Sequence, residues 1–461
     1  MGLVAGVLAV NAVFLAVGYA LLACVMPVSA SYAGVALIAG AGSTGVGVFL
    51  AVVGGLHAGL LALALVSVLL AVAGGAVAVR LGRARPTSGP ALSREGAALL
   101  VPLVAVLAVV LVGGFRTTPW LDDSWGIWLP KAVALQAHGL DAGLFVPNGT
   151  FVSFEVPDYP LWWSSVLALD VRAVGSVDVR IIDAQLALLV VAFAATLVRL
   201  LWGRVRQWLL LAGALLVAAS PEFLRQAQSG AADLPLAMFA SVAALGGALW
   251  LVRRDRLGLA LCGVCAAAAL ATKTEGAPEV VLLLAVALVA ARRRALALLP
   301  AVGAAFATIL PWWAWRSAHD VPERIPLRDL LDPSYLADRA GRVGESADTL
   351  AGHMFSPGQW LLLVPLLFAV CLLLAGRTRA ALAPAAAVLL GWAFLVWVYW
   401  AARDDLGYLL GTSSYRTVDP FVLVAGVFLP AVLELLLQER EPLRQDRVLV
   451  GELRDHRRVV Q

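Results

Sequence analysis

Charged residues are scarce in this chain. Only 14% of the 461 residues are Asp, Glu, Lys or Arg, whereas 61% are hydrophobic, and the mean hydropathy is +0.89. In an average soluble domain about a quarter of the residues are charged. The composition therefore excludes an ordinary soluble domain and predicts an integral membrane protein. The net charge of +4 is explained by cytoplasmic arginines and does not indicate a nucleic-acid partner.

Cysteine and histidine are also rare. The four cysteines, Cys24, Cys262, Cys265 and Cys371, all lie in apolar segments, which predicts buried thiols rather than a zinc site or a disulfide framework. The five histidines are scattered without the spacing of metal ligands. These two residue types therefore do not indicate a metalloenzyme.

Long apolar runs separate the few charges. A helix needs roughly 20 residues to cross a bilayer, so these runs predict a bundle of about 13 spans rather than a barrel of short alternating strands. The spans that begin at Trp208, Leu257 and Ala277 are shorter than a full crossing. The expected spans are 3–25, 33–53, 59–79, 97–115, 181–201, 208–219, 231–251, 257–271, 277–291, 295–313, 360–375, 380–400 and 420–437.

Arginine clusters set the expected orientation. Every second loop is basic, and short basic loops stay in the cytoplasm. The clusters comprise Arg80, Arg83, Arg85, Arg199, Arg204, Arg206, Arg253, Arg254, Arg256, Arg292, Arg293, Arg294, Arg377 and Arg379. Loops 116–180, 314–359 and 401–419 are then extracytoplasmic, and 439–461 is a cytoplasmic tail. Long loops beside a rigid bundle commonly carry function, so the chemistry is expected on the extracytoplasmic side.

The first large outer loop contains two adjacent carboxylates. Asp122 and Asp123 follow soon after a span, near the membrane interface, where partial desolvation can turn a carboxylate into a useful base. The alternative is that Asp122, Asp123 or Ser124 caps the next helix. Pro130 suits the first turn of a helix over 131–138. Lys131 would then lie near a helix N-terminus, either as a phosphate ligand or as a lysine that reaches lipid headgroups.

Other polar groups recur on the same outer side. The aromatic stretch 157–163 predicts a second interfacial helix, with an aromatic belt as the alternative. Asp233, the 272–276 turn and Arg416 place charges at helix ends, where charges are costly unless they are used or paired. The alternative for these charges is structural, because Lys273 can pair with Glu275 and Arg416 with Asp419.

These motifs, in this order, resemble the GT-C superfamily of polytopic glycosyltransferases. The matching segments are 122–123, 128–132, 158–161, 232–235, 273–276 and 414–416. The resemblance implies an all-α transmembrane bundle in a bacterial cytoplasmic membrane, with an extracytoplasmic active site and a polyprenyl-phosphate-sugar donor. The acceptor would be a cell-envelope glycan, glycolipid or protein. The Ala-, Val- and Arg-rich composition suggests a high-GC bacterium such as an actinobacterium, and hence mannose or arabinofuranose as the sugar.

Two features depart from the family pattern. The carboxylate loop follows the fourth span rather than the first, so residues 1–80 resemble an added three-helix unit before a catalytic core at 97–438. Segment 157–160 stands where some branches have His-Pro-Pro, which leaves the acceptor open.

The resemblance also implies roles for individual residues. Asp123 is the expected general base of an inverting transfer, with Asp122 as its partner or alternative. Lys131, Lys273 and Arg416 are expected to bind the donor phosphate. The expected substrate-binding residues are Tyr159, Trp162, Trp163, Asp233, Glu275, Arg316, His319 and Tyr415. Adjacent carboxylates can bind a divalent cation, but relatives with monophosphate donors usually work without one, so the resemblance implies no cofactor and no required metal.

Two other classes of function fit a membrane bundle. A transporter or flippase would use the outer residues to recognise a polar or lipid-linked substrate, but transporters place ionisable groups near mid-bilayer and carry internal repeats. Here the spans are nearly free of charge, which favours chemistry at one surface. A structural subunit would leave the outer charges paired and tolerant of mutation.

Overall fold

The computed structural model describes residues 2–56, 90–146, 156–323, 326–376 and 379–459. Within these ranges the regular structure is helical, and the β-structure is limited to an isolated bridge between Trp202 and Val205. The prediction of an all-α fold is confirmed. The expected span 59–79 and the residues Arg80, Arg83, Arg85 and Arg377 lie outside the described residues.

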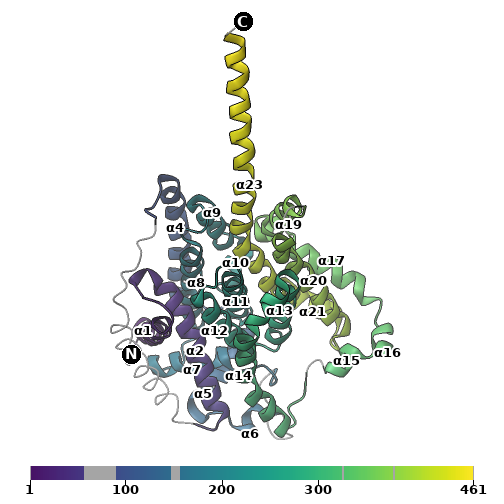
Figure 1. Ribbon diagram of the computed structural model, residues 1–461. Coiled ribbons are helices and arrows are strands. Elements are labelled where there is room, and N and C mark those ends of the chain that lie inside the picture. Colours follow the sequence, from purple (N-terminus) through teal and green to yellow (C-terminus); the bar gives the residue numbers. More distant parts are fainter. Residues whose placement is uncertain (1, 57–89, 147–155, 324–325, 377–378, 460–461) are drawn as a thin grey trace.

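The helices follow the apolar runs of the sequence (Figure 1). Their bounds are α1 (Leu3–Ala23), η1 (Ala30–Tyr32), α2 (Ala33–Val53), α4 (Arg94–Arg116), η2 (Ser124–Trp128), α5 (Leu129–His138), α6 (Ala142–Phe145), α7 (Trp162–Val174), α8 (Arg180–Leu201), α9 (Gln207–Ala218), α10 (Pro221–Gln226), α11 (Asp233–Arg253) and α12 (Arg256–Thr272). The second half comprises α13 (Gly276–Ala291), η3 (Arg292–Leu298), α14 (Leu299–Ala318), α15 (Leu327–Leu331), α16 (Pro333–Ala337), α17 (Arg342–Met354), α18 (Pro357–Trp360), α19 (Leu363–Leu374), η4 (Arg379–Leu382), α20 (Ala383–Ala401), α21 (Leu406–Thr412), α22 (Ser414–Thr417) and α23 (Asp419–Val459).

The chain is a multi-pass membrane protein. Among the described residues, seven helical segments are long and apolar enough to cross a bilayer, namely Leu3–Ala23, Ala30–Val53, Arg94–Arg116, Arg180–Leu201, Asp233–Arg253, Ala380–Ala401 and Ser414–Glu439. An eighth would combine Arg342–Trp360 with α19 across a bend of 102°. Every expected span within the described ranges contains a helix, but α9, α12 and α13 have only 12, 17 and 16 residues. The total of about 13 crossings therefore stays a prediction.

Small residues let the central helices pack closely. α11 runs against α12, and a Cβ added to Gly246 would lie 2.5 Å from the carbonyl oxygen of Gly258. Such close approach of backbones is typical of helix pairs in membranes, where lipid gives no hydrophobic drive for association. α12 starts where Asp255 accepts hydrogen bonds from the backbone of Leu257 and Gly258. α11 also packs against α13 and α23, so these helices form the centre of the bundle.

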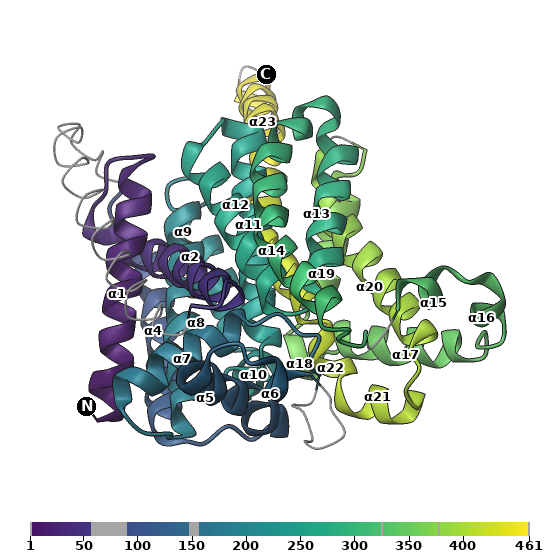
Figure 2. The ribbon, with the colours of Figure 1, turned by 90° about the horizontal axis from the view of Figure 1, so that it is seen from below.

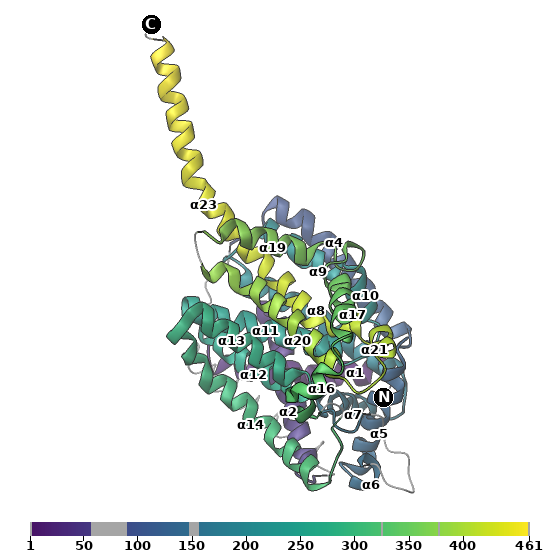
Figure 3. The same ribbon diagram turned by 90° about the vertical axis from the view of Figure 1, so that its right-hand side faces the viewer.

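The second outer loop is attached to α20. The indole nitrogens of Trp392, Trp397 and Trp400 donate to the carbonyls of Ala347, Leu330 and Leu336, respectively. These bonds hold α15, α16 and α17, which lie with α21 on the side of the bundle opposite α1 (Figure 2). At the far end of the chain, α23 continues as one helix beyond the other elements (Figure 3).

Candidate functional site

Four predicted motifs that are distant in sequence meet in a chain of ion pairs. Nη1 of Arg416 lies 2.5 Å from Oδ2 of Asp123 and 3.6 Å from Oδ2 of Asp233. Nζ of Lys273 lies 2.8 Å from Oδ1 of Asp233 and 3.6 Å from Oε1 of Glu275. Negative and positive side chains therefore alternate along Asp123, Arg416, Asp233, Lys273 and Glu275. We call these five residues the ion network.

Helix starts bring the ion network together. Asp233 is the first residue of α11, and Lys273 and Glu275 form the turn between α12 and α13. Arg416 belongs to α22, immediately before α23. Unpaired backbone N–H groups at a helix N-terminus favour a carboxylate there. The apolar packing of α11, α12, α13 and α23 thus places these charges at one end of the bundle.

Asp123 is available for more than helix capping. It precedes η2, a single π-helical turn, and its side chain makes no capping hydrogen bond to that turn. Asp122 is exposed, and its Oδ1 accepts from the backbone N–H of Asp123. The hydroxyl of Ser124 donates to the carbonyl of Ser229, which ties η2 to the segment before α11. π-Turns are frequent at functional sites, and here the turn directs Asp123 toward Arg416.

The middle of the ion network is buried and its two ends are accessible. The side chains of Asp233 and Lys273 are each 5% exposed and that of Arg416 is 10% exposed, whereas Asp123 and Glu275 reach 23% and 27%. Although burial favours the neutral amine, the carboxylates of Asp233 and Glu275 raise the pKa of Lys273 well above its usual value. The two carboxylates therefore favour the charged form of Lys273. Burying charged side chains costs free energy. Proteins commonly accept such a cost at functional sites.

Tyr159 extends the ion network toward the first outer loop. Its hydroxyl donates to Oε1 of Glu275 at 3.5 Å, and Nζ of Lys273 lies 5.2 Å from its ring centre. The same ring stacks on Trp128 with centres 5.6 Å apart. The predicted 158–161 motif thus meets the 273–276 motif, as the expected shared site requires.

Lys131 is fully buried beside this stack. Its ammonium donates to the carbonyl of Val156 at 2.6 Å and lies 5.9 Å from the centre of the Tyr159 ring. Burial lowers the pKa of Lys131 to about 7, although the nearby Asp158 carboxylate opposes this shift. Lys131 thus lies beside the same Tyr159 ring that Lys273 approaches. Its visible role is to hold the segment that carries Tyr159.

The remaining expected residues fall into two groups. Trp162 and Trp163 are fully buried in α7, where their indole nitrogens donate to the carbonyls of Gly42 and Gly230. Arg316 lies 3.7 Å from Glu323, and His319 stacks on Trp315. No direct contact with the ion network is recorded for these four side chains among the described residues. α7 is a buried helix, because both of its faces are covered by neighbouring helices, and the interfacial position expected for this segment stays a prediction.

Tyr415 leads to a group that sequence reasoning missed. The guanidinium of Arg225 lies between the rings of Tyr415 and Trp120, with its carbon 4.1 Å and 4.8 Å from their centres. Its Nε and Nη2 donate to the two carboxylate oxygens of Glu222. Burial lowers the pKa of Arg225, but the pairing with Glu222 raises it overall. Arg225 therefore braces Tyr415, the neighbour of Arg416. The only signal in the sequence was the i, i+3 spacing of Glu222 and Arg225.

Three hydroxyl groups form a second missed cluster. The hydroxyl of Tyr399 lies 2.7 Å from that of Ser413 and 3.1 Å from that of Thr417. Ser413 and Thr417 flank Arg416 in sequence, and Tyr399 comes from α20. Nothing in the apolar sequence of α20 marked Tyr399, because its partner helix was unknown.

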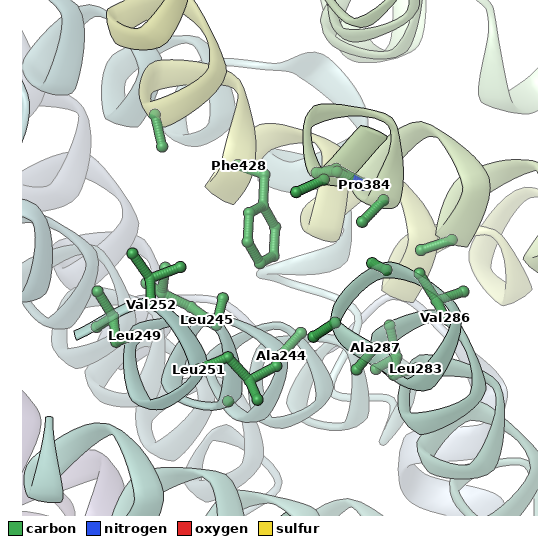
Figure 4. Close-up of a pocket in the computed structure, with 18 of the residues that line it drawn as sticks. Ala244, Leu245, Leu249, Leu251, Val252, Leu283, Val286, Ala287, Pro384 and Phe428 are labelled. Carbon is green, nitrogen blue, oxygen red and sulfur yellow. The ribbon is translucent and has the colours of Figure 1, made fainter. Parts of the chain in front are cut away.

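An apolar pocket lies within the helical bundle. It has a volume of about 480 Å³ and is lined by α11, α13, α20 and α23. Leu245, Leu283 and Phe428 are among its lining side chains (Figure 4). The lining extends from Val280 and Val424 to Arg204 and Gln438. Val280 and Val424 follow the starts of α13 and α23 by four and five residues, about 6 to 8 Å along the helix axes.

Known proteins offer no direct comparison for this site, so it is described by its own geometry. Comparisons of the chain with protein-family models, curated proteins and solved structures found no match. Within the described part of the chain, no group of three or more His, Cys, Asp and Glu side chains is arranged to hold a metal ion.

Proposed function

We propose that the chain is an inverting glycosyltransferase of the GT-C type, which uses a polyprenyl-phosphate sugar as donor. The observation that carries the proposal is the contact of a partly exposed carboxylate, Asp123, with a buried cation, Arg416, which is linked through Asp233 to a second cation, Lys273. A base and a phosphate-binding cation are the two groups that this transfer needs in one place.

The chemistry follows from these positions. Asp123 accepts the proton of an acceptor hydroxyl while the hydroxyl oxygen attacks C1 of the sugar. The bond from C1 to the phosphate oxygen breaks, and its electrons leave with the lipid phosphate. Arg416 and Lys273 stabilise the charge of the departing phosphate, and a guanidinium can bind two of its oxygens. Attack from the face opposite the phosphate inverts the anomeric centre.

The apolar pocket suits the lipid part of such a donor. Its lining is almost entirely aliphatic and begins on α13 at Val280, roughly 7 to 8 Å along the helix axis from Glu275. A prenyl chain attached to a phosphate at Arg416 and Lys273 would enter this pocket. Apolar surface buried there contributes roughly 25 cal/mol per Å² to binding.

The closing test is a transfer assay on purified protein in lipid nanodiscs. Decaprenyl-phosphate mannose, arabinose, glucose and aminoarabinose are supplied with cell-envelope glycan, and released decaprenyl phosphate is measured by mass spectrometry. Release with at least one sugar, and its loss in Asp123→Asn, would support the proposal. If none of these donors is consumed by the folded protein, the proposal is wrong.

A transporter or flippase is the competing function. It would move a labelled lipid between leaflets of a vesicle without breaking the bond between C1 and phosphate. The charges of the ion network gather at the starts of α11 and α13 and just before α23, which favours a reaction at a surface over passage through the bundle. If intact donor moves between the leaflets and no decaprenyl phosphate is released, the protein is a transporter.

A further inference from the structure

Arg416 is shared between two carboxylates through a single nitrogen. Its Nη1 contacts Oδ2 of both Asp123 and Asp233. Its Nε is buried and has no hydrogen-bond partner among the described residues. A buried N–H group without a partner costs free energy, and an incoming anion would relieve that cost.

The ion network carries more negative than positive groups. Asp123, Asp233 and Glu275 are three carboxylates, whereas Lys273 and Arg416 are two cations. A phosphate entering this site adds a further negative charge. It can be accommodated with little repulsion only if one carboxylate gives up its cation, because like charges at short range in a buried site are strongly unfavourable.

Asp123 is the carboxylate that can leave. Asp233 is buried and stays paired with Lys273 at 2.8 Å. Asp123 is the more exposed, and Arg416 is its single ion-pair partner in the described part of the chain. Water can solvate Asp123 after it separates from Arg416, whereas Asp233 is held in the interior by Lys273.

We propose that the donor phosphate and Asp123 compete for the guanidinium of Arg416, so that donor binding releases the carboxylate that acts as base. This inference rests on the proposed function, because it takes the ligand to be a lipid phosphate. It implies an order: the donor binds first, and the acceptor hydroxyl meets a free base only when the donor is in place. Before that, Arg416 occupies the oxygen of Asp123 that would accept the proton.

The competition makes an unusual prediction for a residue of the reaction centre. Removing the charge of Asp123 should strengthen the binding of the donor phosphate, although it abolishes turnover. Asp122→Asn is the matched control. It removes the same charge at the neighbouring position, where the Asp122 side chain bonds to the backbone of Asp123 rather than to Arg416. Asp123→Glu keeps the charge and should bind the phosphate as the native protein does.

The experiment titrates decaprenyl phosphate, without acceptor, into the protein in nanodiscs and measures Kd by isothermal titration calorimetry. Asp123→Asn should bind about tenfold more tightly than the native chain, a typical size for coupling at one site. Asp122→Asn should change Kd by less than about twofold, because exposed charges are screened. Unfolding midpoints without lipid check that each variant is folded. Asp233 remains beside Arg416 in Asp123→Asn, so a folded variant is expected.

The possible results are distinct. Equal or weaker binding by Asp123→Asn would overturn the competition while leaving the glycosyltransferase proposal intact. Equal tightening by Asp122→Asn and Asp123→Asn would also overturn it, because the effect would then reflect overall charge. Absence of decaprenyl phosphate binding in every folded variant would contradict the proposed function itself, and the competition with it.

Discussion

Arg416 and Asp123 form an ion pair of 2.5 Å although they are 293 positions apart in the sequence. One comes from the short helix before α23 and the other from the loop before η2. Each was a weak candidate alone, because an outer arginine or aspartate is commonly a solvated surface charge. Their contact, with Asp233 on the other side of Arg416, turns two separate expectations into one site.

The two adjacent carboxylates should differ sharply in a transfer assay. Asp123→Asn is expected to lower kcat by about 100-fold to 10,000-fold, the usual contribution of a general base. Asp122→Asn should lower it by less than about threefold, since Asp122 is exposed and bonds only to the backbone of its neighbour among the described residues. Initial rates at saturating donor measure both variants. A large loss in Asp122→Asn with little loss in Asp123→Asn would reverse the assignment.

The buried pair of Lys273 and Asp233 should be strongly coupled. Lys273→Met leaves Asp233 buried beside Arg416 alone, and Asp233→Leu leaves Lys273 with the more distant Glu275. Removing one partner of a buried pair costs about 3 to 5 kcal/mol. The double variant should lose less than the sum of the single variants, because neither charge is then unpaired. Thermal unfolding in detergent measures all four proteins, and additive losses would show that the pair is not coupled.

The sequence predicted the helical, membrane-embedded fold because apolar runs and arginine clusters are local signals. It also predicted which charged residues belong to one site, but not which carboxylate pairs with which cation. The structural alternative paired Lys273 with Glu275 and Arg416 with Asp419. Lys273 does lie 3.6 Å from Glu275 but is closer to Asp233, and Arg416 binds Asp123. These partners depend on how α11, α12, α13 and α23 pack, and uniformly apolar helices carry little information on which faces meet.

Buried polar residues were the hardest to assign. Lys131 resembled an interfacial lysine because tryptophans surround it in the sequence, yet Trp128 is buried with it and lies against its ammonium, while Trp120 and Trp125 are exposed. Tyr399 gave no signal, since its hydroxyl partners come from a segment outside its own helix. A single sequence shows which residues are polar, but it does not show which of them the packing will enclose.

Lys131 should make stability depend on pH. Its pKa is about 7 in the folded protein and about 10.4 in an unfolded chain. Between these values the unfolded chain holds one more proton, so the free energy of unfolding rises with pH, by at most about 1.4 kcal/mol per unit. Below pH 7 both states are protonated and this dependence ends. Unfolding midpoints from pH 6 to 9.5 should therefore rise in the native chain.

Lys131→Met is the control for this dependence. It keeps a long apolar side chain beside Trp128 and Tyr159 but has no proton to lose. Its midpoints should be flatter over the same range of pH, and at pH 6.5 it should be at least as stable as the native chain if the Val156 segment keeps its position. A rise of the same size in both proteins would assign the dependence to another group.

The apolar pocket should determine which lipid chain lengths the protein accepts. Ala287 lines the pocket on α13, so Ala287→Trp would fill part of its volume. The variant is expected to raise KM for a decaprenyl-phosphate sugar by about tenfold, equivalent to about 1.4 kcal/mol. KM for a short farnesyl-phosphate sugar should change little, because a short chain need not reach this depth. Steady-state rates with the two donors measure the effect.

Val289 supplies the matched control, because it lies on the same helix but outside the pocket lining and is 82% exposed. Val289→Trp adds the same indole to the outer surface of α13 and should leave KM for both donors within about twofold, since a bulky apolar side chain facing lipid makes little difference to a membrane helix. Equal effects of Ala287→Trp on the long and short donors would place the prenyl chain elsewhere. Equal effects of the two tryptophan variants would trace the change to α13 as a whole rather than to the filled pocket.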